Sequence, residues 1–117
     1  MNNIEAVREY CLSKKGVEET FPFDNDTLVF KVLGKMFLLT SLTTSPFRFN
    51  VKCDPIIAIE LREQYPFIIP GFHMDKTHWN TITISENVSP QFVANWIDHS
   101  YELVIRKMSK KTQALLK

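Results

Sequence analysis

The segment from Pro70 to Asn80 concentrates hydrogen-bonding and stacking side chains within a few positions of this 117-residue sequence. It holds two of the three histidines, His73 and His78, together with Lys76 and Trp79, and it lies between two short apolar runs. Lysine binds phosphate as a point charge, and aromatic rings stack on bases. A segment that only connected two strands would need few such groups, so we expect a recognition surface here.

Metal binding and nucleophilic catalysis are the other chemistries that these residue types allow. His73, Asp75 and His78 contain metal-ligating atoms, but their spacing matches no common zinc pattern. Cys53 beside a histidine would make a nucleophile pair, yet it closes an apolar strand, where a small buried residue suits packing. The three glycines are isolated at positions 16, 34 and 71, which excludes a glycine-rich phosphate loop. We therefore expect no catalytic residue, no metal, no cofactor and no enzymatic activity.

Length and composition predict one ordinary domain over residues 1–117. Hydrophobic residues make up 44% of the chain, enough for a modest core, and no apolar run approaches the roughly 18 residues of a membrane span. The first residues lack the layout of a secretion signal. Cys11 and Cys53 show no metal-type spacing and are expected to be buried and reduced. Together these features favour a cytoplasmic protein that is a monomer.

The charge is unevenly distributed, although the net charge is only +1. Residues 27–53 carry Lys31, Lys35, Arg48 and Lys52 and no acid, and residues 103–117 carry five basic residues and no acid. Two such tracts can form a basic face of the kind that binds phosphate backbones. They can equally be solvated surface lysines. Charge alone leaves both interpretations open.

The first half of the chain reads as a helix followed by a hairpin. Ile4, Val7 and Cys11 recur on one stripe and predict a helix over 3–14, which Gly16 ends. Glu18 and Glu19 are expected in a solvated loop. The apolar runs 28–33 and 36–42 then predict a tight hairpin joined by Gly34-Lys35.

The second half predicts one more half-buried strand and three helices. In Phe47–Lys52, Phe47, Phe49 and Val51 point one way, whereas Arg48, Asn50 and Lys52 point the other. Asp54-Pro55 and Ser89-Pro90 are cap signals for helices over 55–64 and 90–107, and Ser109 is expected to cap 110–116. Short extended pieces are expected at 67–69 and 81–84. This order predicts an α+β fold with an antiparallel sheet covered by helices on one face.

Several motifs resemble one known family along nearly the whole chain. They are Phe30-Lys31-Val32, Gly34-Lys35-Met36-Phe37, Val51-Lys52-Cys53-Asp54-Pro55, Arg62-Glu63-Gln64-Tyr65-Pro66, the Pro70–Asn80 segment and Asp98-His99-Ser100-Tyr101. In this order they resemble the MmcQ/YjbR family of small bacterial proteins, and Lys76-Thr77-His78-Trp79 is the most specific part. The resemblance implies a frataxin-like, or double-wing, fold with a curved antiparallel sheet backed by helices. It also implies DNA binding through the outer face of that sheet.

Two functional hypotheses follow. In the first, the protein binds DNA, with phosphate contacts from Lys31, Lys35, Arg48, Lys52 and Lys76 and a surface shaped by His78 and Trp79; its affinity should then fall steeply with salt. In the second, segment 70–80 is the wall of a pocket for a protein or small ligand. A deep apolar concavity beside Trp79 and His73 would favour the second hypothesis, because a duplex needs an open surface. A purely structural role is the third possibility, with Trp79 packed against a helix and His78 bonded to backbone.

Overall fold

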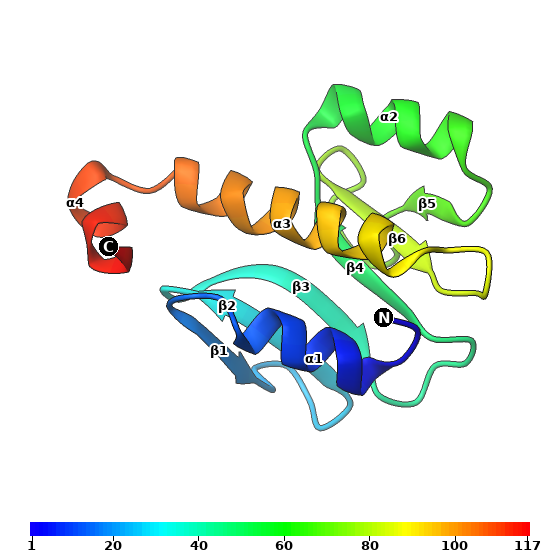
Figure 1. The fold of residues 1–117 in the computed structure, drawn as a ribbon, viewed down its shortest axis with the longest axis horizontal. Helices are drawn as coiled ribbons and strands as arrows, with labels where there is room; N and C mark the ends of the chain where they lie inside the picture. Colours follow the sequence, from blue (N-terminus) through cyan, green and yellow to red (C-terminus); the bar gives the residue numbers. More distant parts are fainter.

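The structure is a computed structural model that describes residues 1–117 and is built on one curved, six-stranded sheet (Figure 1). All neighbouring strands are antiparallel, in the order β1-β2-β3-β4-β6-β5. The strands are β1 (Val17–Thr20), β2 (Thr27–Val32), β3 (Lys35–Ser41), β4 (Arg48–Lys52), β5 (Ile68–Pro70) and β6 (Trp79–Thr83).

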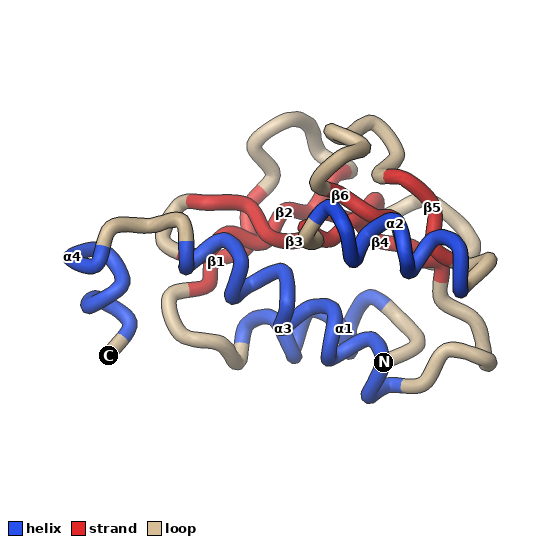
Figure 2. Tube along the Cα trace, turned by 90° about the horizontal axis from the view of Figure 1, so that it is seen from above, coloured by secondary structure: helices blue, strands red, loops and turns tan.

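The helices gather on one side of this sheet, and loops rise above the other side (Figure 2). The helices are α1 (Ile4–Leu12), α2 (Pro55–Gln64), α3 (Pro90–Arg106) and the short α4 (Lys110–Gln113), which runs into a 3-10 turn at Ala114–Leu116. The predicted α+β fold, with an antiparallel sheet covered by helices on one face, is confirmed. No helix combines the length and the apolar character needed to cross a membrane.

The central hairpin is confirmed, but its turn lies one residue earlier than predicted. β2 and β3 are joined by Leu33-Gly34 rather than by Gly34-Lys35, and Lys35 pairs with Val32. Both turn residues have positive φ, 48° at Leu33 and 84° at Gly34, as the tight turns that match strand twist require. Glycine occupies the second turn position rather than the first, and this shifts the strand start to Lys35.

Strand β1 corrects the prediction for Glu18 and Glu19, which lie in a strand and not in a loop. β1 is an edge strand whose Glu18 is opposite Lys31 of β2, and Glu19 accepts two hydrogen bonds from the Arg8 guanidinium. Val17 is the only apolar residue of Val17–Thr20, and none of the four residues is fully buried. A strand at the edge of a sheet can have this composition because it buries little side-chain surface. Its strand character comes from pairing with β2, which the local sequence does not encode.

The remaining elements agree closely with the sequence. In β4, Phe49 and Val51 are buried while Arg48, Asn50 and Lys52 are half-buried on the opposite face, as the alternation predicted. The Asp54, Ser89 and Ser109 side chains accept backbone hydrogen bonds at the starts of α2, α3 and α4. β6 begins at Trp79, two residues before the predicted start, so the end of the Pro70–Asn80 segment is itself part of the sheet.

The main core lies between the sheet and the helices. Its 19 buried residues include Val7 of α1, Phe30 and Phe37 of the hairpin, and Ile97 of α3. The Ser100 hydroxyl fixes α3 to the sheet beside a bulge in β3, where it donates to the Phe37 carbonyl at 2.5 Å and accepts from the Lys52 N–H at 2.8 Å. This one buried side chain therefore links α3 to one backbone group of β3 and one of β4.

Candidate functional site

A second and much smaller apolar cluster lies on the other side of the sheet. Val29 of β2, Leu39 of β3 and Trp79 of β6 form it, with the half-buried Met36 and Met74 packed against them. Trp79 is only 7% exposed and does not pack against a helix, in contrast to the structural alternative considered from the sequence. Its ring instead helps to form the floor on which the loops of this face rest.

The 71–78 segment folds over Trp79 and is held by its own polar groups. The Lys76 ammonium donates to the Gly71 carbonyl at 2.8 Å, and the Gly71 N–H donates to the Trp79 carbonyl at 2.8 Å. A Cβ added to Gly71 would lie 2.7 Å from the Trp79 Cβ, so only glycine allows this approach. Within the same segment, His78 Nδ1 lies 2.7 Å from the Asp75 carboxylate, and this hydrogen bond lowers the pKa of Asp75.

A polar network fixes the Phe72 backbone to the middle of the sheet. The Phe72 N–H donates to the Thr81 hydroxyl at 2.9 Å, and the Asn50 amide donates to the Phe72 carbonyl at 3.2 Å. A short hydrogen bond from Thr81 to Asn50 closes the network between β4 and β6. The segment is thus attached to two strands and not merely draped over them.

Arg62 of α2 holds the same segment from the helix side of the molecule. Its guanidinium donates to the Asn80 side chain at 2.6 Å, to the Trp79 carbonyl at 3.2 Å and, by a short bond, to the Lys76 carbonyl. No role for Arg62 was predicted from the sequence, although it begins the Arg62-Glu63-Gln64-Tyr65-Pro66 motif. An arginine in the last turn of a helix looks like an ordinary surface residue until its tertiary partners are known.

The loop before β2 stands opposite the 71–78 segment. The Asp24 carboxylate accepts backbone hydrogen bonds from Asp26 (2.9 Å) and Thr27 (2.6 Å), and these bonds lower the pKa of Asp24. The Ser41 hydroxyl of β3 donates to Asp26 at 2.7 Å. These contacts keep Phe23, which is 63% exposed, at the rim of the sheet rather than in its core. The sequence did not predict this side of the site, because no residue near Phe23 signals a binding function.

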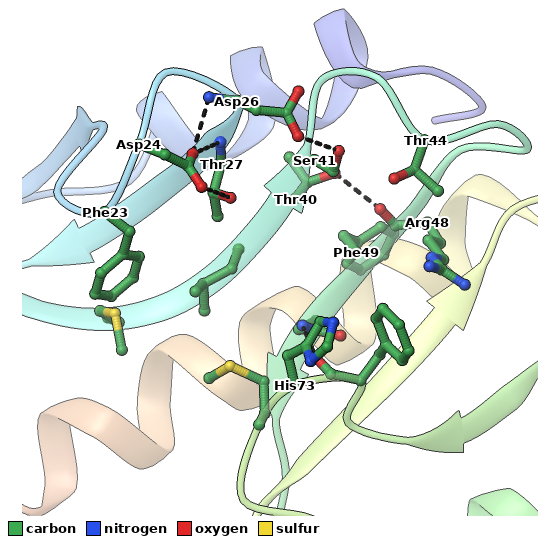
Figure 3. A pocket seen from close by; sticks show the side chains of 15 residues that line it. Phe23, Asp24, Asp26, Thr27, Thr40, Ser41, Thr44, Arg48, Phe49 and His73 are labelled. Atoms are coloured by element: carbon green, nitrogen blue, oxygen red, sulfur yellow. Dashed lines mark hydrogen bonds between the residues drawn. The ribbon is translucent and has the colours of Figure 1, made fainter.

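A cavity of about 540 Å³ lies between these two loops (Figure 3). Phe23, Asp24 and Asp26 line it from the first loop, and Phe72, His73 and Met74 from the second. Residues of β3 and β4, among them Met36, Leu39, Arg48 and Asn50, complete its lining. A volume between about 300 and 1,000 Å³ with a mainly apolar lining is typical of sites for small molecules.

Arg48 and His73 are among the polar side chains of this cavity that have no protein hydrogen-bond partner. The Arg48 guanidinium lies 4.7 Å from the centre of the Phe72 ring and forms no hydrogen bond or ion pair. His73 has a positive φ of 59°, uncommon for a residue with a side chain, and its imidazole packs 4.1 Å from the Phe72 ring. Both groups are oriented by Phe72 and keep their hydrogen-bonding capacity available.

Three lysines from neighbouring elements gather at the opposite ends of β3 and β4. The pKa of Lys52 is lowered, mainly by burial and in addition by the positive charges of Lys107 and Lys35. The negative charge of Asp75 raises it again in part. Lys35 begins β3, Lys52 ends β4 and Lys107 follows α3, so the fold brings together charges from both basic tracts of the sequence. None of the three has a carboxylate within 4 Å. We call Lys35, Lys52 and Lys107 the lysine cluster.

The residues predicted to bind DNA are therefore not equivalent. Lys35 and Lys52 belong to the lysine cluster, and Lys31 lies nearby on β2, whereas Arg48 stands at the other end of β4 in the cavity. Lys76 and His78 are engaged within their own segment, and the burial of Trp79 leaves little ring surface for stacking. The role of these residues in nucleic-acid binding stays a prediction.

The two cysteines are both buried and neither forms a disulfide. Burial raises the pKa of Cys11 and of Cys53 to about 12, so both thiols are protonated near neutral pH. The structure gathers no group of three or more histidine, cysteine, aspartate or glutamate side chains that could hold a metal ion.

Comparisons with known proteins point to one family. A family model described as YjbR matches residues 12–103. The protein YbdF of Escherichia coli O157:H7, described as uncharacterised, is 36% identical over 110 residues, which cover 93% of this chain and 89% of YbdF. The protein YjbR of Escherichia coli K12, also described as uncharacterised, is 24% identical over 97% of this chain and 96% of its own.

Two solved structures share the fold. The crystal structure of Deinococcus radiodurans protein DR2400, which has a DUF419 domain, matches 99% of this chain and 88% of its own with a TM-score of 0.92 and 38% identity. A Pseudomonas syringae protein matches 86% of this chain and 97% of its own with a TM-score of 0.73. At 22% identity the second likeness concerns the fold alone.

Proposed function

We propose that this protein, which belongs to the YjbR family, binds a small molecule. The proposed site is the cavity on the open face of its sheet. The observation that carries the proposal is a cavity of about 540 Å³ walled by two loops, each hydrogen-bonded internally or to the sheet. Both walls are preformed, so a ligand would not have to order them on binding.

Two features favour a small ligand over a duplex at this position. The two loops rise on either side of the cavity and narrow the access to the sheet between them, whereas a duplex needs a broad exposed surface. The lining includes Asp24 and Asp26, whose charges oppose the row of phosphates that a duplex would place along the whole cavity. We further propose binding without catalysis, because no hydroxyl in the cavity hydrogen-bonds to the His73 imidazole to make an activated nucleophile.

The four methionines provide a direct test, because Met36 and Met74 line the cavity while Met1 and Met108 pack against the main core. We expect indole or phenylacetate to shift the methyl resonances of Met36 and Met74, with saturation, and to leave Met1 and Met108 in place. Met36→Trp should block the cavity and abolish the shift of the remaining reporter, Met74, whereas Glu102→Trp on the exposed side of α3 should preserve both shifts. If no probe shifts Met36 and Met74 up to its solubility limit, the proposal is wrong.

The lysine cluster favours a second candidate function, which we also propose: weak binding of DNA at the Lys35–Lys52 end of the sheet. Lysines without carboxylate partners release counterions when they meet phosphates. With about four phosphate contacts, including Lys31, affinity for a labelled duplex should fall about a hundredfold between 50 and 200 mM salt. Lys35→Gln/Lys107→Gln should weaken binding, and Lys110→Gln/Lys117→Gln should not. Absence of binding at about 50 mM salt would reject this function.

A further inference from the structure

We infer that the ligand of the cavity is an amphipathic anion: an apolar, preferably aromatic body that carries one carboxylate or similar acidic group. This inference rests on the proposed small-molecule function and specifies its chemistry. The juxtaposition that carries it is a guanidinium without a protein partner and a set of apolar side chains, all lining one cavity that is partly open to solvent.

Arg48 is the anion-binding group of this arrangement. Its guanidinium forms no hydrogen bond and has no carboxylate within 4 Å, so its N–H donors are available. Stacking on Phe72 limits its rotation, and Phe72 is itself hydrogen-bonded to Asn50 and Thr81. A guanidinium held in this way is suited to two parallel hydrogen bonds with a planar carboxylate.

The rest of the lining indicates an apolar body for the ligand. Met36, Leu39 and Met74 contribute thioether and aliphatic surface, and Phe23 and Phe72 contribute rings from opposite walls. Methionine side chains adapt to irregular ligand shapes and make favourable contacts with aromatic rings. A purely polar anion such as inorganic phosphate would leave this surface without a partner.

The acidic wall fixes the orientation of the ligand. Asp24 and Asp26 stand on the β2 side of the cavity, while His73 comes from the segment attached to β4 and β6 (Figure 3). The two carboxylates accept hydrogen bonds from Thr27 and Ser41 and repel a second negative charge. The anionic group therefore points away from this wall, to Arg48, and the apolar end points to Phe23.

The test compares three ligands of the same shape and different charge: phenylacetate, phenylacetamide and phenethylamine. Methionine-methyl titrations of the full-length protein should give a dissociation constant for phenylacetate at least about tenfold lower than for phenylacetamide, with phenethylamine weakest. Arg48→Gln should remove most of that tenfold preference and change phenylacetamide binding less than about threefold. Arg106→Gln, a surface arginine on α3, should leave all three constants unchanged.

Two results would overturn the inference. If wild-type protein binds phenylacetamide as tightly as phenylacetate, the cavity binds small molecules without recognising an anion, and the proposed function survives alone. If Arg48→Gln keeps the preference for phenylacetate, Arg48 is not the anion-binding group. The first comparison needs no variant, so a folding defect in Arg48→Gln cannot mask it. Benzylphosphonate binding at least as tight as phenylacetate would extend the inference to phosphoryl groups.

Discussion

The two faces of the sheet are built on opposite principles. The helix-covered face buries 19 residues in one continuous core, and its polar groups, such as Ser100, are satisfied within the protein. The apolar cluster of the open face has only three buried residues, Val29, Leu39 and Trp79, and Arg48 and Lys52 on this face have no carboxylate partner. This difference indicates that the first face stabilises the fold, whereas the second is available for recognition.

The largest expected effect tests the stabilising face. Ser100→Ala should lower the free energy of unfolding by about 2–4 kcal/mol, because it leaves the Phe37 carbonyl and the Lys52 N–H buried without a partner. Urea denaturation measures the change. Ser109→Ala, which removes only the cap of the exposed helix α4, is the control and should cost about 1 kcal/mol or less. Similar losses for the two variants would show that the Ser100 bridge is unimportant.

A second variant tests whether the open face depends on its loop. Gly71→Ala should cost about 1–3 kcal/mol and shift the Met74 methyl resonance, because the new Cβ would meet Trp79 at 2.7 Å. Phenylacetate binding should weaken as the wall moves. Thr77→Ala, in the same segment but without a side-chain hydrogen bond, provides the comparison and should leave both measurements unchanged. Unaltered phenylacetate binding in Gly71→Ala would separate the loop from the cavity.

The third prediction concerns pH and the helix-covered side. His99 accepts a hydrogen bond from the Asp54 N–H at 3.2 Å, and burial lowers its pKa below the usual 6.5. His99 therefore takes up a proton at a higher pH in the unfolded chain than in the folded chain. The contribution of neutral His99 to the free energy of unfolding is fully present above about pH 6.5 and is lost as the pH falls through the lower pKa of the folded state. Between pH 7 and 5 the free energy of unfolding should decrease less in His99→Gln than in the wild type, by a difference of less than about 1 kcal/mol. An identical pH profile for the variant would contradict this role.

The smallest expected effect distinguishes the lysine cluster from a stabilising feature. Lys52→Met should raise the free energy of unfolding by about 0.5 kcal/mol, because it removes a half-buried ammonium close to Lys35 and Lys107. The same change should weaken any DNA binding. Lys31→Met is the comparison and should be nearly neutral for stability. A destabilising effect of Lys52→Met would mean that the cluster contributes to the fold.

The sequence predicted the helix-covered face better than the open face, for a physical reason. Caps at Asp54 and Ser89 and the alternation in Phe47–Lys52 are local signals, so they indicated elements within one or two residues of their true ends. Strand β1 was missed because its pairing with β2 is not encoded locally. The sequence predicted only one wall of the cavity, at residues 70–80. The other wall, around Asp24, lies about 50 residues away in the chain, and the pairing of the strands brings the two walls together.

The functional residues show the same limit. Arg48 was chosen for its charge and Trp79 for its ring, but charge and ring type do not reveal whether a group is engaged. Arg48 has no partner and faces the cavity, whereas Trp79 is buried and Lys76 is bonded to Gly71. Arg62, which positions the whole segment, was quoted only as part of a motif.

The most direct test of the account is where a bound ligand sits. In a saturated complex with phenylacetate, nuclear Overhauser effects should connect the ring protons of the ligand to the methyl groups of Met36 and Met74, and to neither Met1 nor Met108. Contacts to Met1 or Met108, or contacts to none of the four methyls, would contradict the claim that the open face of the sheet holds the binding site.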